Sequence, residues 1–240
     1  MDTNSNTSRS TGLSLRQAAI IAGLGLLLMA VLAPIAQFGV LQKLVVAGDA
    51  TTTANNILAS MGLFRFGIFI FLIVAILDVV VAWALYVLLR PANPSLSLLT
   101  AWFRVVYAAI FISALSNLLI VVQLLNGPGT LNILGANSLH AQVMVSLNAY
   151  TDGWNMALIV FGLHLLLLGS LAFRSGYVPK WLAILVVIAG LGYLVDNVGK
   201  LLSSNYNLSV SMFTFIGEVV LIFWLLWKGV KGFSSELESQ

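Results

Sequence analysis

The sequence predicts an all-α integral membrane protein, a polytopic helical bundle of six transmembrane helices with both termini in the cytoplasm. Of its 240 residues, 60% are hydrophobic and only 8% are charged, whereas an average soluble domain carries roughly 25% charged residues. The mean hydropathy of +1.02 is typical of a chain that faces lipid. Apolar runs such as residues 68–81 lack the alternation of polar and apolar positions that a membrane β-barrel requires.

Six stretches are long enough to cross a bilayer, whose hydrocarbon core of about 30 Å requires roughly 20 apolar residues in a helix. The predicted spans are 18–41, 63–89, 99–125, 153–173, 181–202 and 208–228. The first span is longer than the core of a cleaved signal peptide, which holds about 7–15 apolar residues. We therefore expect all six spans to remain in the membrane.

The spans form one predicted transmembrane domain over residues 16–231. The polar segment 1–15 is rich in Ser, Thr and Asn and is expected to be disordered, and residues 232–240 are expected to form a frayed cytoplasmic tail. The longer of the two outer loops, 126–152, carries Leu139, Val143 and Leu147 at every fourth position behind a candidate cap, Ser138. This pattern predicts a short amphipathic helix on the outer leaflet or packed as a lid over the bundle.

The distribution of basic residues predicts the orientation, because Lys and Arg concentrate in cytoplasmic loops. With the N-terminus inside, eight basic residues are assigned to the cytoplasmic side: Arg9, Arg16, Arg90, Arg104, Arg174, Lys180, Lys228 and Lys231. Three are assigned to the other side: Lys43, Arg65 and Lys200. The location predicted is the inner (plasma) membrane. The net charge of +3 is spread over loops instead of clustered, so it does not indicate a nucleic-acid partner.

Catalytic motifs are missing from the sequence. There is no cysteine, which excludes disulfides, thiolate metal sites and cysteine nucleophiles. No HExxH, GxSxG or GxGxxG motif occurs in a meaningful context. We therefore predict no catalytic residue, no metal site and no cofactor.

The informative residues are the polar ones inside the spans, because each charged side chain costs about 2.5–3.5 kcal/mol at the centre of a membrane helix. The candidate ligand- or ion-binding residues are Arg65, Asp78, Asn117, His164, Asp196, Lys200 and Glu218, and Asp152 lies close to this set. Their distribution predicts a polar core that opens outward and binds a small ligand or relays ions.

Helix geometry predicts some pairings among these residues. Asp196 and Lys200 are four residues apart, so they are expected to pair on one helix face. Ser211, Thr214 and Glu218 form a polar stripe that should face the bundle interior. Arg65 is the expected counter-ion for one of three carboxylates: Asp152, Asp196 or Glu218.

Asp78 is the candidate that structural pairing explains least readily, whereas His164 has a mainly structural interpretation. Asp78 stands alone among apolar residues 67–84 and is expected to be protonated or hydrogen-bonded across helices. His164, next to Gly162 and a run of leucines, is more typical of a hydrogen-bonded core residue than of a ligand-binding one. Structural pairing, a ligand or ion pathway, and catalysis all remain open. A structural or accessory subunit that binds other membrane proteins is the alternative function.

Several segments of the sequence form a recognisable set. The main segment is residues 173–183 (FRSGYVPKWLA), continued by 192–196 (GYLVD). The shorter segments are 48–50 (GDA), 64–65 (FR), 88–91 (LLRP) and 162–164 (GLH). Together they resemble one bacterial membrane family, "domain of unknown function 4386". The resemblance extends from about residue 16 to residue 231 and implies a polytopic inner-membrane protein. It supplies no activity, cofactor or catalytic residue.

Overall fold

The computed structural model describes residues 13–127, 129, 135–203 and 205–234, and these residues form helices and connections without strands. Six helical segments are long and apolar enough to cross a membrane, which confirms the predicted fold class. These segments are Leu15–Leu44, Met61–Leu89, Pro94–Asn126, Ala136–Arg174, Lys180–Leu202 and Ser211–Lys231. Residues 1–12 and 235–240, which hold most of the two predicted disordered ends, lie outside the described residues.

Some of the six segments are built from more than one helical element. The elements in chain order are α1 (Leu15–Ala36), the π-helix η1 (Gln37–Leu41), α2 (Gln42–Leu44), α3 (Ala50–Ala59), α4 (Met61–Leu89), α5 (Pro94–Asn126), α7 (Ala136–Arg174), α8 (Lys180–Leu202), α9 (Ser211–Thr214) and α10 (Ile216–Lys231). The first membrane segment runs through α1, η1 and α2, and the last runs through α9 and α10.

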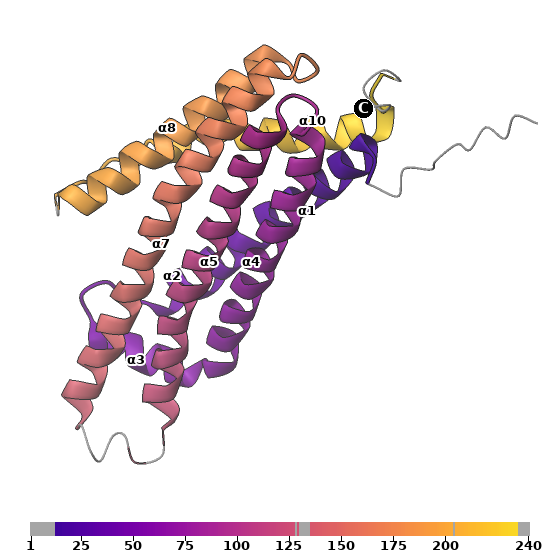
Figure 1. Ribbon diagram of the computed structural model, residues 1–240. Coiled ribbons are helices and arrows are strands. Elements are labelled where there is room, and N and C mark those ends of the chain that lie inside the picture. Colours follow the sequence, from indigo (N-terminus) through magenta and orange to yellow (C-terminus); the bar gives the residue numbers. More distant parts are fainter. Residues whose placement is uncertain (1–12, 128, 130–134, 204, 235–240) are drawn as a thin grey trace, which may run out of the picture.

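The six membrane segments form a closed ring. Each one packs against the next in the chain, from α1 through α4, α5, α7 and α8 to α10, and α10 returns to α1. Figure 1 shows α4, α5 and α7 side by side along the molecule, with α8 and α10 inclined across the end where the chain terminates. The side chain of Arg16 donates a hydrogen bond to the carbonyl of Gly229 (2.9 Å), which joins the first and last helices. A ring of this kind leaves its centre to be filled by side chains or by a cavity.

Local sequence signals fix the helix ends. Ser14 begins α1 with a capping box, because its hydroxyl accepts from the N–H of Gln17, and the Gln17 side chain accepts from the N–H of Ser14. Asn93 caps α5 and Pro94 occupies the first turn, where a missing N–H costs nothing. Gly232 has a φ of +84°, a conformation that favours glycine, and the preceding helix ends there.

The N-terminus of α3 lies in the connection between the first two spans. Asp49 accepts hydrogen bonds from the backbone N–H of Thr52 (2.8 Å) and from its hydroxyl (2.7 Å). These bonds hold the pKa of the Asp49 carboxyl below its usual value of 3.8, because they stabilise the ionised form.

Close helix contacts depend on small residues. A Cβ atom added at Gly217 of α10 would lie 2.4 Å from the carbonyl oxygen of Leu185, so only glycine allows this approach. A Cβ atom added at Gly62 of α4, in contrast, would have no neighbouring atom within 4 Å, so this glycine does not serve a close helix contact.

The expectation of a separate surface helix after residue 126 is wrong. Residues 136–152 are the first part of α7, which continues to Arg174 without a break. Leu139, Val143 and Leu147 are buried, so they extend the inward face of that helix. Gly153 does not interrupt this helix. A Cβ at this position would lie 2.9 Å from the Cβ of Ala114, so the glycine allows close contact with α5. The predicted cap Ser138 lies inside the first turn instead of before it.

Candidate functional site

A buried ion pair lies at the centre of the bundle. The Arg104 guanidinium on α5 donates to the Asp78 carboxylate on α4 across 2.6 Å, and each side chain is only 3% exposed. The two residues are nearly equidistant in sequence from the turn between α4 and α5, so this antiparallel hairpin places them at the same depth. Phe71 and Phe111, deeper in the same hairpin, also face each other, with ring centroids 5.7 Å apart.

His164 on α7 completes this group. Its Nδ1 lies 2.8 Å from the carbonyl oxygen of Thr100, and a carbonyl can only accept, so Nδ1 carries the proton. Nε2 lies 3.4 Å from Nη1 of Arg104 and is therefore the acceptor of a neutral ring. The Phe161 ring lies 5.5 Å from the guanidinium carbon of Arg104. Asp78, Arg104 and His164, called here the central triad, thus connect α4, α5 and α7.

A cavity of about 380 Å³, called here the central cavity, is lined by Asp78 and Arg104 of the triad. All six membrane segments contribute to its wall. The lining residues are Leu26, Met29, Ala30, Ala33, Pro34, Val74, Asp78, Arg104, Tyr107, Trp154, Leu158, Phe161, Tyr193, Phe215, Glu218, Val219 and Ile222. Ala30 and Pro34 on α1 and Phe215 before α10 are exposed, so the cavity reaches the outer surface of the ring. Most of the wall is aliphatic or aromatic.

Three side chains in this wall carry buried polar atoms that have no hydrogen-bond partner among the described residues: Nε of Arg104, Nε1 of Trp154 and Oε1 of Glu218. Two donors and one acceptor without a partner among the described residues therefore belong to side chains that line one cavity.

The structure brings together three of the sequence-predicted site residues, Asp78, His164 and Glu218. Asp78 is bonded across helices and His164 is a hydrogen-bonded core residue, as expected from the sequence. The polar stripe on the last span also faces inward: Ser211 contacts Asp196, Thr214 packs on Gly192, and Glu218 lines the cavity.

The other candidates lie elsewhere. Arg65 is exposed at the start of α4 and, within the described part of the chain, forms no ion pair, so its predicted role as a counter-ion is wrong. Asn117 donates to the carbonyl of Ala114 one turn earlier in its own helix. Lys200 and Asp152 are exposed and line a separate cleft between α7 and α8.

The predicted pairing of Asp196 with Lys200 is also wrong. The Asp196 carboxylate accepts from the hydroxyl of Tyr206 (2.8 Å) and from the backbone N–H groups of Val210 (2.9 Å) and Ser211 (2.7 Å), and from the hydroxyl of Ser211. These donors satisfy the carboxylate and leave the lysine side chain on the surface. Asp196 therefore anchors the segment that leads into α9, which is a structural role.

Arg104 is the site residue that sequence reasoning missed. It lies within the predicted span 99–125, yet it is counted above among the cytoplasmic residues, whereas the structure buries it. The sequence signal that could have identified it is its position, because Arg104 and Asp78 lie at nearly the same distance along the chain from the turn between α4 and α5. Because Arg104 is buried within a span, the number of basic residues that the sequence assigns to the cytoplasmic side falls from eight to seven.

The site contains no evident metal centre. Within the described ranges, no three His, Asp or Glu side chains gather into a group that could hold a metal ion. The chemistry available in the central cavity is hydrogen bonding and charge in apolar surroundings.

Comparisons with known proteins identify the family of this chain. The family model "Domain of unknown function (DUF4386)" matches residues 21–229. An uncharacterized protein of Archaeoglobus fulgidus is 43% identical over 162 residues, which cover 68% of this chain and 82% of the relative. No solved structure gives a significant match. The chain, a multi-pass membrane protein, belongs to the family described as domain of unknown function 4386.

Proposed function

We propose that this protein binds a small, mainly apolar molecule in the central cavity, with Glu218 as its principal polar contact. The volume of about 380 Å³ falls within the range of roughly 300–1,000 Å³ that is typical of small-molecule sites. The wall combines apolar and aromatic side chains with a few polar groups, which is also the usual composition of such sites. The exposed rim at Ala30, Pro34 and Phe215 favours a ligand that arrives from the bilayer.

The observation that carries this proposal is the set of unpartnered polar atoms. A buried donor or acceptor without a partner costs about 1–3 kcal/mol, and three side chains of one cavity wall bear such atoms. A ligand with both a donor and an acceptor would satisfy the Glu218 carboxylate on one side and the Arg104 or Trp154 N–H on the other.

The central triad then has a supporting role. Arg104 neutralises Asp78, and Nε2 of the neutral His164 accepts from Nη1 of the guanidinium. This arrangement fixes the side of the cavity formed by α4, α5 and α7. Glu218 on α10 takes no part in these bonds. Its carboxyl group interacts with the side chain of Tyr193, and its Oε1 has no hydrogen-bond partner among the described residues.

The test is native mass spectrometry of the protein purified in mild detergent, compared with the chain mass of 25.8 kDa. We expect a reproducible extra mass below that of a phospholipid, and loss of this mass in Glu218→Ala. Asp152→Asn is the matched control, because it removes a carboxylate that is exposed and outside the central cavity. An unliganded spectrum for the wild type, or retention of the mass in Glu218→Ala, contradicts the proposal. A second polypeptide in its place would support the accessory-subunit function.

We further propose that the end of the ring with the termini faces the cytoplasm. The described basic residues at that end are Arg16, Arg90, Arg174, Lys180, Lys228 and Lys231, and cytoplasmic ends are typically enriched in Lys and Arg. Because the chain has no cysteine, single cysteines at Ser175 and Gly62 can be labelled from one side of sealed cells. The proposal requires Gly62→Cys to react with an impermeant reagent from outside and Ser175→Cys to be protected.

A further inference from the structure

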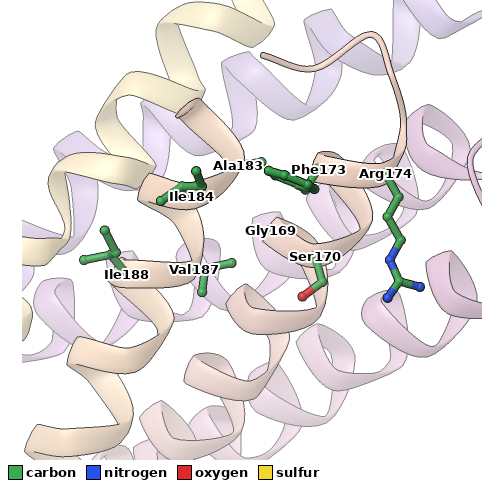
Figure 2. A pocket seen from close by; sticks show the side chains of 8 residues that line it. All are labelled: Gly169, Ser170, Phe173, Arg174, Ala183, Ile184, Val187 and Ile188. Carbon is green, nitrogen blue, oxygen red and sulfur yellow. The ribbon is translucent and has the colours of Figure 1, made fainter. Parts of the chain in front are cut away.

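A second hollow lies at the end of the bundle that carries the termini. It is a groove of about 280 Å³ between the last turns of α7 and the first turns of α8, and Figure 2 shows its lining side chains. The lining residues are Gly169, Ser170, Phe173, Arg174, Ala183, Ile184, Val187 and Ile188. None of them belongs to the central cavity, so this groove is an independent site.

The groove is apolar along its length and open on its outer side. A Cβ at Gly169 would lie 2.6 Å from Val187 and 2.8 Å from the carbonyl oxygen of Ala183, so the two helices touch along its floor. Along its length Phe173, Ile184 and Ile188 are 43%, 49% and 41% exposed. The groove therefore offers an open, mainly apolar surface between two membrane segments.

Two basic residues lie beside the groove. Arg174, the last residue of α7, is one of the residues that line it, and in Figure 2 its side chain extends back along α7 to about the level of Ser170, on the side away from Ile184 and Ile188. Lys180, the first residue of α8, places its ammonium group 5.4 Å from the ring centroid of Phe173, which lines the groove. No acidic residue lines the groove, and Arg174 forms no ion pair within the described part of the chain. Two cations that form no ion pair with a described residue therefore lie beside an apolar groove.

We propose that this groove, called here the α7–α8 groove, binds an anionic phospholipid. The phosphate group would lie between Arg174 and Lys180, and one acyl chain would extend along Phe173 and Ile184 toward Ile188. Basic pockets between membrane helices are typical sites for anionic headgroups, and arginine binds phosphate through paired hydrogen bonds. The charge complementarity selects an anionic lipid over a zwitterionic one.

The test compares binding of phosphatidylglycerol and phosphatidylcholine by native mass spectrometry in mild detergent. We expect the wild type to retain one phosphatidylglycerol molecule preferentially. The double substitution Arg174→Gln/Lys180→Gln should weaken this binding about 30-fold, because each interfacial cation contributes roughly a fivefold effect. The matched control is Lys228→Gln/Lys231→Gln, which removes two charges at the same end but away from the groove, and it should change binding less than about threefold.

A second variant tests the groove itself. Ser170→Trp places an indole in the groove at an exposed position, and it should abolish retention of phosphatidylglycerol while the melting temperature stays unchanged. Equal retention of the two lipids overturns the proposal. So does an equal loss in the control double variant, which would show a general charge effect, or full retention in Ser170→Trp.

Discussion

Asp78→Asn tests the central ion pair, because it removes the negative charge and leaves the side chain nearly the same size. The substituted amide oxygen could still accept a hydrogen bond, but the Arg104 guanidinium would remain 97% buried without a counter-charge, beside a 3.4 Å contact to His164 and the face of an aromatic ring. Removing one partner from a buried pair costs about 3–5 kcal/mol, since the remaining charge is uncompensated. We expect the free energy of unfolding to fall by about this amount.

The assay is unfolding by SDS in mixed micelles, followed by far-UV circular dichroism. Asp152→Asn, which neutralises an exposed carboxylate, should change the free energy by less than about 0.5 kcal/mol. The double variant Asp78→Asn/Arg104→Gln should be less destabilised than the sum of its single variants, because the uncompensated charge is gone. An Asp78→Asn variant as stable as the control, or strict additivity in the cycle, would refute the structural role of this pair.

Three further predictions concern residues outside the triad. Asp196→Ala should destabilise the protein by about 2–4 kcal/mol, because its carboxylate accepts four hydrogen bonds. Lys200→Gln should be neutral in the same unfolding assay. Equal destabilisation by the two variants would instead support an ion pair between Asp196 and Lys200. Gly217→Ala should lower the melting temperature, since its Cβ would meet a backbone oxygen. Gly62→Ala should raise the melting temperature, because alanine favours the helix by up to about 1 kcal/mol. If both variants shifted the melting temperature in the same direction, the close contact at Gly217 would be contradicted. Because the pKa of Asp49 is lowered in the folded state, its contribution to the start of α3 is present at neutral pH and is lost as pH falls through the folded-state pKa, below 3.8. Hydrogen exchange of the first-turn amides should therefore accelerate only below about pH 4, and faster exchange at pH 6 would count against the cap.

The fold was predictable from the sequence because the bilayer imposes one strong requirement. A helix that crosses lipid must be apolar over its whole length, and this property is visible in composition alone. The predicted ends at Leu89 and Leu202 coincide with the helix ends in the structure. The extension of α7 by 17 residues before position 153 was not predictable in this way, because residues 136–152 alternate buried apolar positions with mostly polar exposed ones and so do not form an apolar run.

The site was less predictable because pairing depends on which helices are neighbours. Asp78 and Glu218 are identifiable as costly residues within apolar spans. The partner of Asp78 lies on the next helix, however, and Arg104 also fits the pattern of an interfacial arginine near the end of a span. Asp196 and Lys200 satisfy the spacing for a helical ion pair, but backbone donors from a following connection reach the carboxylate instead. Sequence spacing describes contacts within one helix and does not describe the donors supplied by another segment.

The central claim is that the central cavity holds a small molecule, and an experimental structure of the protein in lipid nanodiscs tests it most directly. The account predicts non-protein density in the cavity, within hydrogen-bonding distance of Oε1 of Glu218 and of a donor on Arg104 or Trp154. A cavity closed by direct contact between Glu218 and Arg104, with no additional density, would contradict it.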